Sequence, residues 1–189
     1  PEIRAQKQAL VDMLIPVVKA WSTDSGIDVA NTAVQVFGGA GYIEESGAPQ
    51  FLRDVRIAAI YEGTNGIQAL DLVGRKIARD GGAAAQALVA EMRALDTDLG
   101  EHSDIEDLNI IQEALQKAIG ALEEATAWVV ETYPKSPDSV ASGAVPYLEL
   151  MGTTTGGWLM ARAALAAHKR LSGGEDSPFL REKMRSSRF

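Results

Sequence analysis

The chain has 189 residues, of which 46% are apolar and 23% charged, with no cysteine and a formal net charge of −8 at pH 7. The absence of cysteine excludes disulfides, thiol nucleophiles and cysteine-based metal sites. Two histidines are too few for a multi-histidine metal centre. The negative charge disfavours binding to nucleic acid or to an anionic membrane surface, because phosphate groups require a basic face.

The sequence gives no sign of membrane insertion or of targeting. The most apolar stretch, residues 144–167, contains Glu149 and Arg162, so we predict no membrane span. Residues 1–4 form no apolar targeting segment, and we therefore expect a cytoplasmic protein. The missing initiator methionine favours a chain that is part of a longer protein.

Apolar residues recur at three- and four-residue spacing along most of the chain, as in amphipathic helices. The predicted helices cover about residues 10–21, 29–37, 49–55, 67–77, 88–99, 108–129 and 138–171. In the second of these, the expected buried face consists of Val29, Ala33, Val36 and Phe37. No strand pattern of useful length is present.

We therefore predict an all-α fold, with an up-down helical bundle followed by a second set of long helices. The glycine pair at 81 and 82 divides the chain into residues 1–80 and residues 83–189. The tail after Ser172 carries four basic residues near its end, and we expect it to be loosely ordered.

Three glycines, Gly38, Gly39 and Gly41, follow the second predicted helix. They match neither the dinucleotide-binding fingerprint nor the P-loop pattern. Two interpretations stay open. The glycines form a helix cap and turn, or they leave a backbone surface without side chains that lies against a phosphate group.

Other residues of the second half are assigned structural roles. The glycines of the last predicted helix, among them Gly152 and Gly156, are expected to let neighbouring backbones approach closely. His102 and His168 lie in unrelated segments and are predicted at the surface, outside any triad context.

Residues 60–68 contain an isolated carboxylate, Glu62, between Tyr61 and Gly63. On the local pattern alone, Thr64 is a helix N-cap and Glu62 is a solvated loop acid. The functional alternative makes Glu62 a general base, with the neighbouring glycine allowing a substrate to approach the backbone.

Residues 35–42, 53–56 and 60–68 resemble, in order and spacing, three motifs of the C-terminal helical domain of the FAD-dependent acyl-CoA dehydrogenases. The helical extension over residues 83–189 resembles the branch that contains 3-methylthiopropanoyl-CoA dehydrogenases. Other parts of the family's chain, an N-terminal helical domain and a middle β domain, are not in these 189 residues. We therefore expect these residues alone to be inactive.

The resemblance implies a role for each matched residue. Glu62 matches the base that removes the α proton of an acyl-CoA thioester while a hydride passes from the β carbon to N5 of FAD, which gives a trans-2-enoyl-CoA. Tyr61 and Gly63 match substrate-binding positions. The implied cofactor-binding residues are Gln35, Gly38 and Gly39, toward the FAD of a neighbouring subunit, and Thr64, Asn65 and Gly66, toward the chain's own FAD. Arg53, Asp54 and Arg56 match a charged stretch that we take to be structural.

The resemblance also implies partners: an acyl-CoA substrate, electron-transfer flavoprotein as electron acceptor, and a second copy of the chain in a dimer or tetramer. No metal is implied. Two alternatives stay open. One is an acyl-CoA oxidase-like flavoprotein that gives its electrons to oxygen, and the other is a helical assembly module without catalysis of its own.

Overall fold

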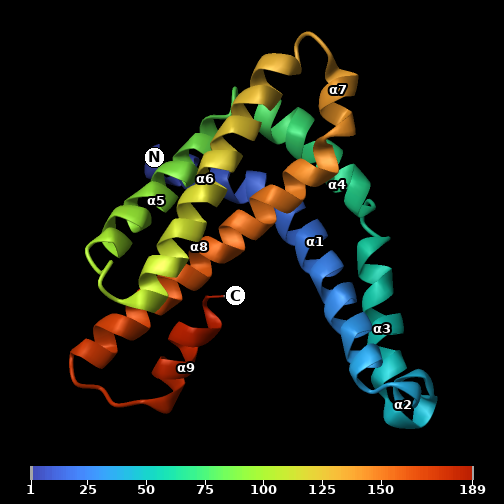
Figure 1. Cartoon of the computed structure of the whole chain (residues 1–189). Helices are drawn as coiled ribbons and strands as arrows, with labels where there is room; N and C mark the ends of the chain where they lie inside the picture. The colour runs from blue at the N-terminus through green and yellow to red at the C-terminus, as the bar shows by residue number, and fades with distance from the viewer. Residues whose placement is uncertain (1, 189) are drawn as a thin grey trace.

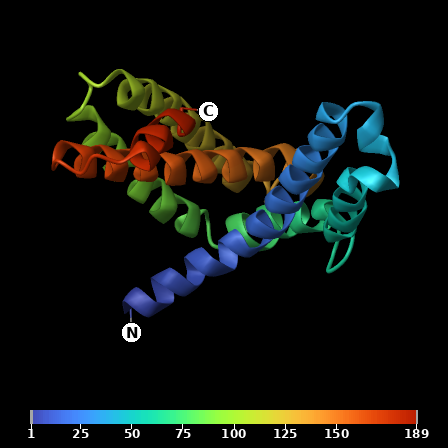
Figure 2. The ribbon, with the colours of Figure 1, turned by 90° about the horizontal axis from the view of Figure 1, so that it is seen from below.

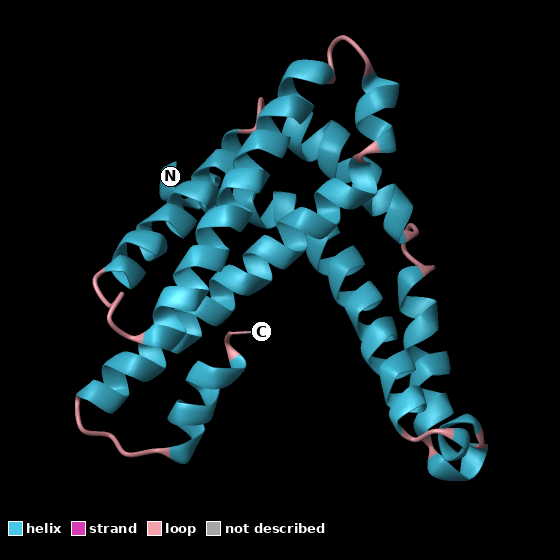
Figure 3. Cartoon of the chain, viewed as in Figure 1, coloured by secondary structure: helices cyan, strands magenta, loops and turns pink. Residues whose placement is uncertain are grey.

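The computed structural model describes residues 2–188, and every regular element in this range is helical (Figure 3). The predicted all-α fold is therefore confirmed. None of the helices in the described range has a stretch long and apolar enough to cross a bilayer.

The first part of the chain is a long helix followed by a chain of short ones that turns back along it. Its elements are α1 (Glu2–Val36), α2 (Gly39–Tyr42), the 3₁₀ turn η1 (Glu44–Ser46), α3 (Ala48–Arg56), the 3₁₀ turn η2 (Ile57–Ala59), α4 (Asn65–Asp71) and the π-helical η3 (Leu72–Ala78). α3 runs antiparallel to the distal half of α1, and with α2 these helices form a projecting arm (Figure 1).

The second part of the chain forms a bundle that makes the other limb of the V seen in Figure 1. Its elements are α5 (Ala83–Gly100), α6 (Glu106–Thr132), α7 (Pro137–Ser142), α8 (Ala144–Ser172) and α9 (Pro178–Ser186). The helix predicted over residues 138–171 is divided at Gly143, whose backbone is not helical. The ring of Trp128 lies where a Cβ of this glycine would point, at 3.5 Å.

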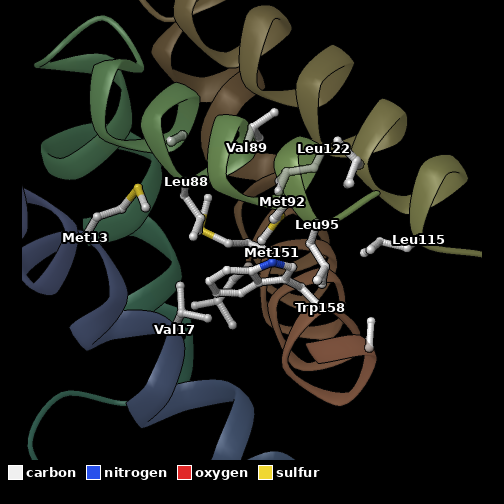
Figure 4. Close-up of a cluster of buried hydrophobic side chains, with 14 of the residues drawn as sticks. Met13, Val17, Leu88, Val89, Met92, Leu95, Leu115, Leu122, Met151 and Trp158 are labelled. Carbon is white, nitrogen blue, oxygen red and sulfur yellow. The ribbon is translucent and has the colours of Figure 1, made fainter. Parts of the chain in front are cut away.

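The two limbs share one core. The proximal half of α1 crosses the bundle, as the turned view in Figure 2 shows, and Lys7 Nζ lies 2.7 Å from Glu91 Oε1 of α5. Met13 of α1 is buried with Met92 of α5 and Met151 of α8 (Figure 4). The predicted apolar positions of α5 are buried, namely Leu88, Met92, Leu95 and Leu99. Burial of this kind is the main source of stability in a helical bundle.

The arm buries a different face from the one that the sequence predicts. The helices predicted over residues 10–21 and 29–37 are one helix, and Val29 and Val36 are 70% and 80% exposed. α3 instead packs on the face of α1 that carries small residues: a Cβ at Gly26 would lie 3.1 Å from Val55 Cγ2, and Ala30 is buried. Close helix approach at small side chains therefore decided the buried face, rather than the larger apolar side chains.

The C-terminal tail is ordered as a helix, so the expectation of a loose tail is wrong. Leu180 and Met184 are four residues apart in α9 and are 3% and 8% exposed. This spacing places both side chains on one helix face, against α8 and α6. Arg188 Nη1 lies 2.9 Å from Asp107 Oδ1 and ties the end of the tail to the start of α6.

Candidate functional site

The loop that carries Glu62 joins η2 to α4 at the base of the arm. Thr64 is the N-cap residue of α4, but its side chain makes no capping hydrogen bond. The side chain of Glu62 is exposed. The local environment is thus an open loop whose acid is not buried by the described residues.

Glu62 has a left-handed backbone conformation, with φ at 56°, and the next residue, Gly63, has φ at 78°. Glu62 is the only non-glycine residue between 2 and 188 with positive φ. Such a conformation costs a non-glycine residue on the order of 1–3 kcal/mol and persists where surrounding contacts enforce it. Strain of this kind at a lone carboxylate is typical of a functional position.

Two side chains from different helices hold this loop. Gln68 Nε2, in α4, donates a hydrogen bond of 3.0 Å to the Glu62 carbonyl. Lys19 Nζ, in α1, donates one of 2.9 Å to the Gly63 carbonyl and another of 2.9 Å to Asn65 Oδ1. The carbonyls of Glu62 and of the residue after it are therefore each bound by a side-chain donor.

The side chain of Asn65 fastens the start of α4 to α1. Its Nδ2 lies 3.1 Å from the Ala20 carbonyl, 2.9 Å from Thr23 Oγ1 and 2.7 Å from Asp24 Oδ1. Three acceptors share its two amide hydrogens, so this side chain serves the fold.

The glycines at the tip of the arm do not all have the same role. The sequence left open whether they form a turn or leave the backbone open to a phosphate group. A Cβ at Gly41 would overlap the Val34 carbonyl, so this glycine lets α2 fold back against α1. A Cβ at Gly38 or Gly39 would meet nothing within 4 Å. These two glycines, with the exposed Gln35, leave the backbone open to an incoming group.

The structure does not bring the two predicted cofactor-binding groups together. Gln35, Gly38 and Gly39 lie at the tip of the arm, whereas Thr64, Asn65 and Gly66 lie beside Lys19 at its base. Gln35 follows Lys19 by 16 positions in α1, which corresponds to about 24 Å at the rise of an α-helix.

Three apolar side chains close to Glu62 in the sequence are exposed. Ile60, Tyr61 and Ile67 are 47%, 51% and 57% exposed. A Cβ at Gly63 would lie 3.3 Å from Gln68 Nε2, so a side chain at this position would crowd the loop. The open face thus consists of apolar side chains and accessible backbone beside a carboxylate.

The charged stretch predicted to be structural forms one ion pair, between Arg53 Nη2 and Glu44 Oε2 at 2.8 Å. The hydrogen bond and negative charge of Glu44 raise the pKa of the Arg53 guanidinium. Within the described residues, Asp54 and Arg56 take part in no ion pair.

The two histidines, predicted in unrelated surface segments, are half-buried and stack edge to face. Their ring centroids lie 4.8 Å apart. No group of three or more potential metal ligands occurs within residues 2–188.

Comparison with known protein families shows the family to which the chain belongs. The model of the "Acyl-CoA dehydrogenase, C-terminal domain" matches residues 3–78, and that of the "Acetyl-CoA dehydrogenase C-terminal like" family matches residues 80–189. The chain belongs to the acyl-CoA dehydrogenase family.

Individual relatives agree with this assignment. The chain is 38% identical over 183 residues to the 3-methylmercaptopropionyl-CoA dehydrogenase of Ruegeria pomeroyi, covering 97% of this chain and 31% of the relative. It is 29% identical over 166 residues to a broad-specificity linear acyl-CoA dehydrogenase of Mycobacterium tuberculosis, covering 86% and 27%. It is also 29% identical over 179 residues to a butyryl-CoA dehydrogenase of Syntrophomonas wolfei, covering 93% and 29%. The chain thus spans less than a third of the length of each relative.

One residue of the site, Lys19, was not among the predicted site residues. Lys19 is the only basic residue between Lys7 and Arg53. This isolation does not identify its acceptors, which lie more than 40 positions further along the chain.

Proposed function

We propose that this chain is the C-terminal part of a flavoenzyme that converts acyl-CoA thioesters to trans-2-enoyl-CoA, with Glu62 as the base. The observation that carries the proposal is the strained, doubly held backbone of Glu62 in a chain of this family. In this proposal residues 1–80 supply the catalytic helical domain and residues 83–189 its helical extension.

The reaction removes two hydrogens from adjacent carbons. The Glu62 carboxylate takes the α proton, and the electron pair of that C–H bond forms the new α,β double bond as a hydride leaves the β carbon. FAD, when bound, supplies the hydride acceptor. The backbone N–H of Glu62 donates to the thioester oxygen and stabilises the negative charge that develops there.

A carboxylate removes such a weakly acidic proton only in a site that excludes water. Glu62 is exposed in the described residues, so the substrate and the remaining two thirds of an enzyme of the relatives' length must cover it. The exposed Tyr61, with Ile60 and Ile67, offers the apolar surface for this contact. Tyr61 and Gly63 are the proposed substrate-binding residues.

The two cofactor-binding groups fit contact with FAD through backbone. Gly38 and Gly39 have open backbones at the tip of the arm, and a Cβ at Gly66 would meet only Thr64 Oγ1, at 3.9 Å. The two groups lie about 24 Å apart along α1. In this proposal they contact two different FAD molecules, as the family resemblance implies, in a homo-oligomer in which the arm of one subunit reaches the FAD of another. The proposed electron acceptor is electron-transfer flavoprotein.

The experiment uses the complete enzyme that carries this chain, loaded with FAD and mixed anaerobically with acyl-CoA thioesters. 3-Methylmercaptopropionyl-CoA is the first substrate to test, because a relative named for it is 38% identical. Bleaching of the flavin absorbance reports reduction. Admission of air afterwards distinguishes an oxidase-like enzyme, whose flavin reoxidises without electron-transfer flavoprotein.

The decisive variant is Glu62→Gln, compared with Glu124→Gln on the exposed face of α6. We expect Glu62→Gln to retain FAD and to lose about 10²- to 10⁴-fold in the rate of bleaching, the usual effect of losing a general base. Glu124→Gln should reduce at the wild-type rate. Unchanged bleaching in Glu62→Gln would place the base elsewhere, and no bleaching in any form would favour a helical module without catalysis.

A further inference from the structure

Lys19 directs its charge at the loop of the proposed base rather than at an acid. Its Nζ lies 2.9 Å from the Gly63 carbonyl and 2.9 Å from Asn65 Oδ1, two neutral acceptors on either side of Thr64. Within residues 2–188 no ion pair includes Lys19. The Lys19 side chain is half-buried, and two hydrogen bonds hold its ammonium against the loop.

These two hydrogen bonds orient a peptide plane. In a trans peptide the carbonyl and the N–H point in opposite directions. Because Lys19 holds the Gly63 carbonyl toward α1, the N–H of Thr64 points away from α1. Gln68 fixes the preceding carbonyl, that of Glu62, from α4.

The clamp by Lys19 and Gln68 matters because the conformation it holds is unfavourable by itself. Glu62 at a φ of 56° lies in a region that non-glycine residues leave when contacts do not enforce it. Without the Lys19 ammonium, the loop is held from α4 by Gln68 but no longer from α1, and the peptide between Gly63 and Thr64 can rotate. The left-handed conformation of Glu62, and with it the direction of the carboxylate, is then less strongly enforced.

We propose that Lys19 is a positioning residue for the reaction: it holds the Glu62 loop in its left-handed conformation and so aims the base. The inference rests on the proposed function of Glu62. We assign Lys19 no part in proton transfer, because two of its three N–H donors are directed at the Gly63 carbonyl and the Asn65 amide oxygen.

The test compares Lys19→Met with Lys7→Met in the complete enzyme. Both variants remove one ammonium from α1 and keep a side chain of similar length, but Lys7 pairs with Glu91 on α5, away from the loop. The first readout is amide hydrogen exchange of residues 60–68 by mass spectrometry. The second readout is the effect of each substitution on kcat and on KM, measured separately for flavin reduction by the acyl-CoA substrate.

For Lys19→Met we expect faster exchange across residues 60–68 and a kcat that falls about 10- to 100-fold, because a misplacement of about 1 Å is enough for such a loss. KM should change less than kcat, because a misdirected base weakens an interaction that is made in the transition state. Lys7→Met should match the wild type in both readouts.

Two outcomes overturn the inference. If exchange in Lys19→Met equals that of the wild type, Lys19 does not hold the loop. If exchange rises while kcat is unchanged, Lys19 holds the loop but does not position the reaction. Failure of the proposed function is seen separately, as full activity of Glu62→Gln.

Discussion

The side chain of Trp21, on α1, lies against Gly152 of α8 and reaches Gly156 one turn further along the same helix. A Cβ at Gly152 would overlap the Trp21 side chain, and a Cβ at Gly156 would lie 3.2 Å from its Cη2 atom. Trp21 Nε1 also donates to Thr153 Oγ1 at 3.3 Å. The extension thus meets α1 two residues from Lys19. At these two positions the glycines make room for the Trp21 side chain, rather than for the close backbone approach that the sequence analysis expects.

Gly152→Ala is expected to destabilise the protein by about 1–3 kcal/mol, the usual cost of forcing extra volume into a packed contact. The matched control is Gly157→Ala in the same helix, because a Cβ at Gly157 would meet nothing within 4 Å. Alanine is favoured over glycine inside a helix by about 1 kcal/mol, so this control should be neutral or stabilising. Urea unfolding measures both variants. Equal stability would show that Trp21 moves aside freely.

The helices of the bundle could be predicted from sequence because their spacing and their burial agree. The apolar positions of α5 and α6 recur every three or four residues, and residues such as Leu99 and Leu122 are fully buried. In the arm the same pattern failed, because Gly26 and Ala30 allow a closer approach than Val29 or Val36. Apolar spacing alone does not show which face a partner helix will choose.

The candidate site, too, could be predicted only in part. Glu62 and its neighbours form a contiguous motif, so the sequence could point to them. The contact of Lys19 with Gly63 joins residues 44 positions apart, and no local pattern encodes such a pair. The left-handed backbone of Glu62 is equally hidden, because it depends on hydrogen bonds from two separate helices.

The protein is expected to lose stability at high pH because one tyrosine, Tyr147, is buried. Tyr147 is 5% exposed and its hydroxyl lies 2.8 Å from Thr126 Oγ1. Burial raises the pKa of Tyr147 to about 12, against a smaller lowering by the Thr126 hydrogen bond. The unfolded chain loses this proton near pH 10 and the folded chain only near 12, so the contribution is complete below pH 10 and is lost as the pH rises toward 12.

The rise of the Tyr147 pKa from 10 to about 12 corresponds to on the order of 2–3 kcal/mol of the free energy of unfolding. This contribution is present below pH 10 and is lost above pH 12. Urea unfolding at intervals from pH 8 to 12 measures it. Other groups also titrate in this range, so the comparison is with Tyr147→Phe, which removes this proton alone. The difference in stability between wild type and variant should fall with pH, and a constant difference would contradict the prediction.

Asp80 caps the start of α5, at the junction between the two parts of the chain. Its two carboxylate oxygens accept hydrogen bonds from the backbone N–H groups of Gly82, at 2.9 Å, and Ala84, at 3.1 Å. Asp80→Ala should therefore reduce stability by about 0.5–2 kcal/mol, the usual value of a helix cap. Asp80→Asn keeps one acceptor oxygen and should lose less. If both variants unfold at the same urea concentration as the wild type, the cap does not stabilise α5.

The docking of α9 gives a test with a control at the neighbouring position. Leu180 is 3% exposed and faces α8 and α6, whereas Phe179 is 68% exposed. Leu180→Ala is expected to cost about 2–5 kcal/mol, because it leaves a cavity in a packed contact. Phe179→Ala, although it removes a larger side chain, should change stability by less than about 0.5 kcal/mol.

Hydrogen exchange adds the local information that global unfolding lacks. In Leu180→Ala the amides of residues 178–186 should exchange faster than those of α5, because α9 is held by few buried side chains, Leu180 and Met184 among them. In Phe179→Ala the exchange of α9 should stay at the wild-type rate. Equal protection of α9 in the two variants would mean that the helix is held by its ends, through the Arg188 and Asp107 ion pair, rather than by its apolar face.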